Sequence, residues 1–300
     1  RANVTWSPKL DFTDQSLFYA SYARGYKGGG ANPPGVIPIA VLTGTRGYPY
    51  ITSPSNQTHP STFEPEFNNA LELGTKNTLL DGDLVLNGDI FLYKYKNYQI
   101  SQIIDRTAVN MNVNATVKGA ELETTWSPLP GLKLGLTSGY ENATADSGQS
   151  AIDIMDRTAG NSDWMVVKPF ITQTSNCILP RATVNEILAG HGDTLPYACV
   201  YAYTFGDDPG TGNPYVPNPG QDSLGNLEPG YAGFDPDSAP NHGEGFNKDI
   251  SGNQLPSAPH FTLSLSGDYS MPLSEDWAGT LHGDFYWQSD SFARVFNDRP

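Results

Sequence analysis

Leucines alternate with polar residues in Asn69-Ala70-Leu71-Glu72-Leu73-Gly74-Thr75-Lys76, in Leu84-Val85-Leu86-Asn87-Gly88-Asp89-Ile90-Phe91-Leu92-Tyr93 and in Val117-Lys118-Gly119-Ala120-Glu121-Leu122-Glu123. Successive side chains of a β-strand point to opposite faces of its sheet, so each stretch has one leucine-rich face and one polar face. A soluble sheet covers its leucines with a second layer, which no segment of this chain is suited to supply. A transmembrane β-barrel leaves the leucines in lipid and turns the polar face toward its lumen. The sequence therefore predicts an all-β fold, an antiparallel transmembrane β-barrel.

The same alternation recurs eight times along the chain. The predicted strands are residues 3–8, 16–25, 66–80, 83–103, 113–126, 131–144, 259–271 and 277–292. Short connections alternate with two long ones, 26–62 and 146–258, and one of intermediate length lies near 104–112. Short turns at one end and long loops at the other are typical of outer-membrane barrels. Residues 1–300 are therefore predicted to form part of a larger barrel with long outer loops.

The composition fits this fold and excludes several classes of function. Charged residues make up 16 % of the chain, against about 25 % in an average soluble protein. The chain nevertheless holds 16 Tyr, 13 Phe and 5 Trp, which a disordered acidic chain would lack. The net charge of −15 argues against a nucleic-acid partner, because binding would release no phosphate counterions. No apolar run reaches the roughly 18 residues that a transmembrane helix needs.

Tryptophans lie beside the short turns. Trp6, Trp126 and Trp277 each stand at the end of a predicted strand, where membrane barrels carry a girdle of aromatic residues. The alternative is a soluble β-sandwich with tryptophan at its rim, which would act as a secreted, non-catalytic glycan-binding module. Such a sandwich requires a second sheet over the leucine face.

The stretch Tyr19-Ala20-Ser21-Tyr22-Ala23-Arg24-Gly25-Tyr26-Lys27-Gly28-Gly29-Gly30 resembles the barrel of TonB-dependent outer-membrane receptors. The resemblance continues, in the order of the family, at residues 63–66, 71–76, 87–95, 118–123, 126–128 and 130–132. It implies a plugged barrel of about 22 strands, of which this chain would supply about a third. The resemblance thus covers most of the predicted strands and neither of the two long loops.

The resemblance also implies a function. Such receptors bind a scarce nutrient outside the cell, commonly a ferric siderophore and sometimes cobalamin, haem or a carbohydrate, and import it with energy delivered through TonB. The expected location is the outer membrane of a Gram-negative bacterium. The expected partners are outer-membrane lipid, TonB, the nutrient and the receptor's own plug domain, and no cofactor or enzymatic activity is expected. The plug is expected before Arg1 and the closing strand after Pro300.

Ligand-binding candidates lie where the second predicted strand leaves the membrane. They are Tyr22, Arg24, Tyr26 and Lys27, with Arg46 and Tyr48 in the loop that follows. Aromatic and cationic side chains suit an anionic ferric chelate through cation–π and charge-assisted contacts. The alternative interpretation is a rim patch that binds lipid phosphates.

Four charged residues are predicted to line the lumen: Glu72, Lys76, Glu121 and Glu123. Adjacent strands bring such side chains within reach of one another. They would contact the plug or line the import path; alternatively, they form ion pairs that keep the wall hydrated and stiff.

The two cysteines, Cys177 and Cys199, lie in one long loop. Two cysteines in an exported chain predict a disulfide, and closing this loop would contribute about 3 kcal/mol. The alternative is two buried thiols.

No motif in the sequence predicts catalysis or metal binding. The histidines His59, His191, His242, His260 and His282 lack metal-ligand spacing, and the acids after residue 206 lack the order of a calcium loop. An outer-membrane barrel enzyme remains an alternative because His282 and Asp284 face the predicted lumen together. No serine accompanies them as a marked nucleophile.

Overall fold

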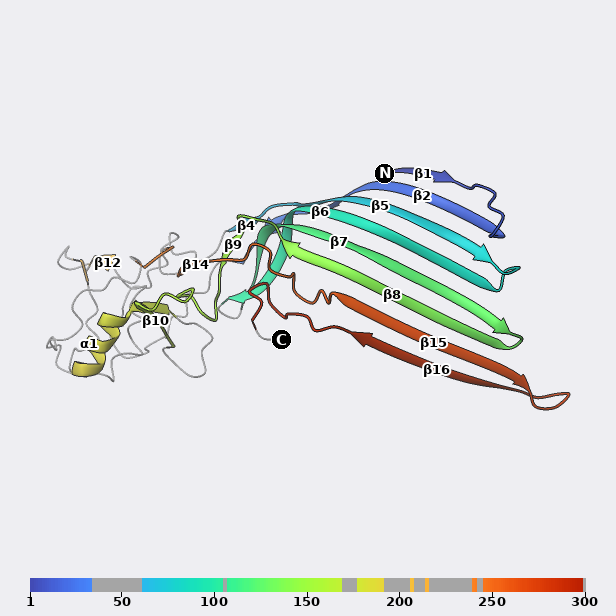
Figure 1. Ribbon diagram of the computed structural model, residues 1–300. Coiled ribbons are helices and arrows are strands. Elements are labelled where there is room, and N and C mark those ends of the chain that lie inside the picture. The colour runs from blue at the N-terminus through green and yellow to red at the C-terminus, as the bar shows by residue number, and fades with distance from the viewer. Residues whose placement is uncertain are drawn as a thin grey trace.

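The computed structural model describes residues 1–33, 61–104, 107–168, 177–191, 206–207, 214–215, 239–241 and 245–298. In these residues, eight antiparallel strands form one sheet in the order of the chain (Figure 1). The strands are β1 (Ala2–Trp6), β2 (Gln15–Lys27), β5 (Glu66–Leu79), β6 (Leu84–Ile104), β7 (Thr107–Leu129), β8 (Leu132–Ala145), β15 (Phe261–Pro272) and β16 (Ala278–Gln288). The sheet is open, with β1 and β16 at its edges. All eight predicted strands are thereby confirmed, although the bounds of several differ.

Smaller elements lie at and beyond the end of the sheet where the long connections lie (Figure 1). They are β3 (Gly30–Ala31), β4 (Thr62–Phe63), β9 (Ser150–Ile152), β10 (Trp164–Val167), β11 (Cys177–Pro180), α1 (Arg181–His191), β12 (Gly206–Asp207), β13 (Pro214–Tyr215) and β14 (Asn247–Asp249). In the described residues, no helix has both the length and the hydropathy to span a membrane.

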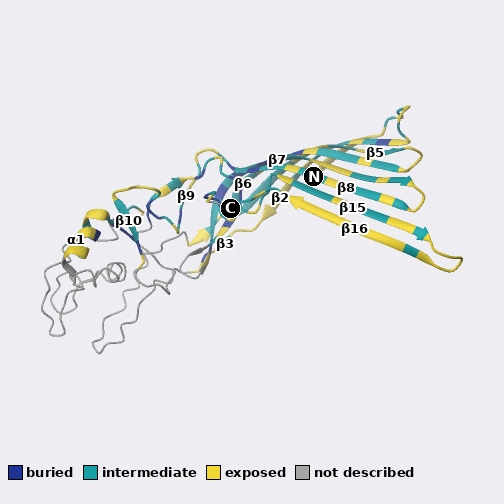
Figure 2. Ribbon diagram, turned by 60° about the horizontal axis from the view of Figure 1, so that its bottom comes forward, coloured by how far each residue is buried: buried dark blue, intermediate teal, exposed yellow. Residues whose placement is uncertain are grey.

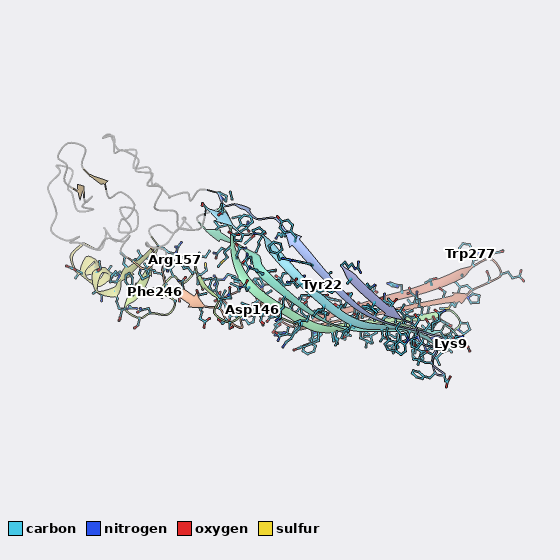
Figure 3. The ribbon with its side chains drawn as sticks, turned by 90° about the horizontal axis from the view of Figure 1, so that it is seen from above. Lys9, Tyr22, Asp146, Arg157, Phe246 and Trp277 are labelled. Atoms are coloured by element: carbon cyan, nitrogen blue, oxygen red, sulfur yellow. The ribbon has the colours of Figure 1, made fainter. Side chains whose placement is uncertain are left out.

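The sheet is a single curved layer. Figure 3 shows Lys9 and Trp277 at its short-turn end and Arg157 and Phe246 toward the opposite end. The described residues contain four further sheets, each of only two strands. The second sheet that a β-sandwich requires is therefore absent from the described part of the chain, which argues against the glycan-binding sandwich.

One face of the sheet, here called the leucine face, remains open to its surroundings. Six of its large apolar side chains are exposed by 41 % to 68 %: Leu71, Leu73, Ile90, Leu265, Leu281 and Phe285. Burying such side chains is worth about 1.5–3 kcal/mol each, so a sheet in water would not leave them uncovered. Their exposure in a single layer is what contact with lipid predicts.

The predicted connection near residues 104–112 is too long, because β7 already begins at Thr107, whereas β6 ends at Ile104, close to its predicted end at residue 103. Val109 and Val113 alternate with asparagines on β7 and are only 1 % and 2 % exposed. The connection between β2 and β5 binds this part of β7 through Asn32. The Asn32 side chain donates to the Asn110 carbonyl at 2.9 Å and accepts from the Asn110 N–H at 2.8 Å. Burial of the two valines and the two hydrogen bonds of Asn32 stabilise a strand here, although the sequence of this stretch predicts a loop.

Part of the long connection between β8 and β15 packs against the sheet. Leu255 is 3 % exposed and lies in one cluster with Phe91, Val117 and Ala143. Its N–H donates to the Ala143 carbonyl at 2.9 Å, so this segment extends the sheet beside β8. Ile250, in the same connection, is completely buried. Figure 2 shows buried residues, in dark blue, gathered at this end of β6 and β7.

A buried carboxylate joins this connection to the segment after β16. Asp153 is 2 % exposed, and its two carboxylate oxygens accept from Arg294 at 2.6 Å and 3.3 Å. Lys248, on β14, lies 4.0 Å away. The Arg294 guanidinium also lies 5.3 Å from the centre of the Phe296 ring. Segments that are far apart in the sequence are thus held together by one ion-pair cluster.

We expect Asp153→Ala in the full-length protein to destabilise this cluster by about 1.5–3 kcal/mol, because its charge-assisted hydrogen bonds from Arg294 are lost. Arg294 is one third exposed and keeps Asp298 as a second acidic partner. Hydrogen exchange of residues 245–255 measures the effect as faster exchange. Asp163→Ala is the matched control, since Asp163 is exposed. Equal exchange in the two variants would show that the ion pair does not hold the segments together.

Candidate functional site

The pairing register gathers the acids of the sheet on the face opposite the leucines, here called the polar face. It carries Glu66, Glu72, Asp89, Glu121, Glu123, Glu141, Asp268 and Asp284. No strand of the eight places an acid on the leucine face. The lysines of the polar face are Lys27, Lys76 and Lys133. The four residues predicted to line the lumen thus share one strongly acidic surface.

Glu72 is held by an aromatic side chain that lies across β5. The Tyr19 hydroxyl donates to Glu72 Oε1 at 2.6 Å. Tyr19 stands opposite Gly74 in the register, and a Cβ at Gly74 would lie 2.5 Å from the tyrosine ring. Glycine therefore allows the ring to lie against the backbone and reach the carboxylate.

Asp89 belongs to this site, although the sequence analysis did not single it out. The register places Asp89 opposite Glu121 on β7 and opposite Gly74 on β5. Like charges directly opposite each other on a sheet are unfavourable. The period-two alternation of β6 could have identified Asp89, since it shares a face with Asn87.

In the eight described strands, the polar face carries eight acids and only three lysines. Among the described residues, no ion pair joins Lys76 to Glu72, Glu121 or Glu123. Glu72 instead accepts from a neutral tyrosine, and Glu123 accepts from the Asn87 amide at 3.3 Å. The wall therefore presents largely uncompensated negative charge.

His282 is held between two carboxylates on β15 and β16. Its Nδ1 lies 2.6 Å from Asp268 Oδ1, and its Nε2 lies 2.6 Å from Asp284 Oδ2. Both ring nitrogens are therefore engaged, which leaves neither free to accept a proton from a nucleophile. Within the described ranges, no group of three His, Cys, Asp or Glu residues could hold a metal ion.

The register divides the predicted ligand-binding patch between the two faces. Tyr22, Arg24 and Tyr26 lie on the leucine face, because they alternate with residues of the polar face, whereas Lys27 lies opposite Glu66 on the polar face. The Tyr22 hydroxyl donates to the Asn69 side chain at 2.9 Å, and Figure 3 marks Tyr22 on the strands. This placement favours the interpretation of a rim patch for the three residues on the leucine face.

Three of the candidates cannot be placed. Arg46, Tyr48 and Cys199 lie outside the described residues. Cys177 begins β11, which pairs with β10. The disulfide between Cys177 and Cys199 therefore stays a prediction.

Comparison with known proteins identifies the family. The model of the TonB dependent receptor-like β-barrel matches residues 1–299. No curated protein matches the chain. Solved structures are similar to the chain at low sequence identity, and the chain spans about a quarter of the length of the three described next.

The ferric yersiniabactin uptake receptor FyuA from Yersinia pestis is 14 % identical, with a TM-score of 0.46 over 98 % of this chain and 26 % of that one. BauA, the ferric preacinetobactin receptor from Acinetobacter baumannii, is 11 % identical, with a TM-score of 0.41 over 98 % and 26 %. P. aeruginosa FpvA bound to heterologous pyoverdines is 15 % identical, with a TM-score of 0.40 over 96 % and 22 %.

The family model covers nearly the whole chain, and its outer-membrane β-barrel fold agrees with the single antiparallel sheet described above. The chain belongs to the TonB-dependent receptor β-barrel family.

Proposed function

We propose that this chain is part of the barrel wall of an outer-membrane receptor that imports a scarce nutrient with energy delivered through TonB. A ferric siderophore is the cargo that we propose first. The family match supports the receptor role, and the sequence resemblance to the family supports a metal chelate as cargo.

The separation of charge between the two faces is the observation that carries the proposal. The strand acids all lie on the polar face, and the exposed leucines lie on the other. A wall between lipid and a hydrated lumen needs this arrangement, because a charge at mid-membrane on the lipid side costs about 2–4 kcal/mol.

The acidic wall suits a cationic surface inside the barrel. Glu72, Asp89 and Glu121 lie together on three neighbouring strands, with little compensation from lysine. Charge-assisted hydrogen bonds from arginine or lysine would relieve their repulsion. We propose that the plug domain of the full-length receptor supplies these cations.

The outer loops are proposed to hold the nutrient. The connection between β8 and β15 carries the small elements β9, β10, β11, α1, β12, β13 and β14. Loops on a rigid scaffold commonly carry binding function. Lys27, Arg46 and Tyr48 are the proposed ligand contacts, and a bond between Cys177 and Cys199 would restrain the loop.

The orientation of the wall has a direct test. Leu265→Arg should destabilise the full-length protein by about 2–4 kcal/mol, and Leu134→Arg, which stands opposite Trp126 near the short-turn end, should destabilise it by less. Both leucines lie on the leucine face. Reversible unfolding in phospholipid vesicles measures the change. Ser264→Arg is the control, since Ser264 lies on the polar face of β15. Near-neutral effects at both leucines would reject this orientation.

The transport function is tested in cells that lack other siderophore receptors. We expect the full-length receptor to restore uptake of radioactive iron from at least one ferric siderophore, and only in cells that have TonB. Glu72→Gln combined with Glu121→Gln should reduce that uptake, because the proposed contact with the plug loses its charge. Uptake that is equal with and without TonB would contradict the proposal.

A further inference from the structure

The charges of the leucine face are all positive and all lie near one end of the sheet. Within the eight strands, that face carries Arg24, Lys94, Lys96 and Lys118, and it carries no acid. All four side chains are exposed. The alternation that gathers the acids on the polar face therefore leaves an isolated group of cations on the lipid side, here called the cationic patch.

The register brings the patch together across four neighbouring strands. Arg24 on β2 stands opposite Asn69 on β5, which stands opposite Lys94 on β6. Neighbouring strands lie about 4.8 Å apart, so the backbones at Arg24 and Lys94 are separated by about 10 Å. Lys96 is two residues further along β6, and Lys118 stands opposite Leu92 on β7. One phosphorylated group could reach several of these side chains at once.

The patch lies where the apolar band of the wall ends. On β6 the leucine face runs through Leu84, Leu86, Ile90 and Leu92 before it reaches Lys94. At about 3.4 Å per residue, the eight steps from Leu84 to Leu92 span about 27 Å along the strand. A strand tilt of about 35–45° shortens this to about 19–22 Å, so Lys94, two residues further along, lies near the edge of the roughly 25 Å apolar band of a membrane barrel. Lys94 and Lys96 therefore lie at the level of the lipid head groups.

The cations of the patch have no acidic partner in the described part of the chain. No ion pair there involves any of the four. The Arg24 guanidinium instead lies 4.9 Å from the centre of the Phe67 ring, a contact that orients it without neutralising it. Clustered like charges are unfavourable, so an anion bound among them would relieve their repulsion.

We propose that the cationic patch binds the phosphate of an anionic lipid head group at the long-loop rim of the barrel. The leucines directly below it would contact the acyl chains of the same molecule, a contact that free phosphate could not make. The polar face, where plug and nutrient are proposed to bind, is on the other side of the sheet. The inference therefore concerns the lipid around the receptor and does not depend on which nutrient is imported.

The test compares two matched triple variants of the full-length protein. Lys94→Gln, Lys96→Gln and Lys118→Gln together remove three cations of the patch. Lys27→Gln, Lys76→Gln and Lys133→Gln together remove the same charge from the polar face. Binding of phosphatidylglycerol and of phosphatidylcholine is measured by native mass spectrometry of each protein in detergent.

We expect the patch variant to bind phosphatidylglycerol more weakly by about fivefold for each cation removed, on the order of a hundredfold in all. The polar-face variant should bind it as the unmodified protein does, and phosphatidylcholine binding should change in neither. Lys94→Arg, Lys96→Arg and Lys118→Arg together should retain phosphatidylglycerol binding, which separates loss of charge from a failure to fold.

Two results would overturn the inference. The first is equal phosphatidylglycerol binding by the patch variant and the polar-face variant. The second is displacement of the lipid by millimolar inorganic phosphate, which would show that the patch holds free phosphate and gains nothing from the acyl chains.

Discussion

The hydrogen-bonded register between neighbouring strands is the constraint on which the rest of this structure depends. Each strand alternates its side chains between two faces, but only the register decides which residues of different strands meet. The pairing of β5, β6 and β7 brings Gly74, Asp89 and Glu121 into one row. A shift of one residue on any strand would move its acids into lipid and its leucines into the lumen. The register produces the separation of charge, and the cost of putting charges into lipid in turn disfavours any other register.

Glycines on the polar face allow bulky side chains to fill the wall without a second layer. A Cβ at Gly74 would collide with the Tyr19 ring, and a Cβ at Gly119 would lie 2.6 Å from the Phe91 ring. The aromatic rings therefore lie flat across the neighbouring strand. This close packing stiffens the sheet and, through Tyr19, also orients Glu72.

At the long-loop end of the sheet, apolar side chains are buried within the protein, whereas those of the leucine face are exposed. There, apolar side chains such as Ile100, Val113 and Ile250 are buried against one another as in a soluble protein. The ion pair between Asp153 and Arg294 lies in the same region. The same sheet therefore supports a lipid-facing wall at one end and a water-soluble core at the other, and the proposed cationic patch lies on the strands between them.

The sequence by itself determined the eight strands, their two faces and the family, because period-two alternation is a local property of each strand. It placed Glu72 and Glu121 on one face for the same reason. It missed residues 107–112 of β7, since burial of Val109 depends on contacts that are distant in the chain. It also grouped Arg24 with Lys27, although the alternation of β2 alone sets them on opposite faces. Only the tertiary structure decided which cations meet, because the register between strands depends on long-range pairing that no single stretch of sequence contains.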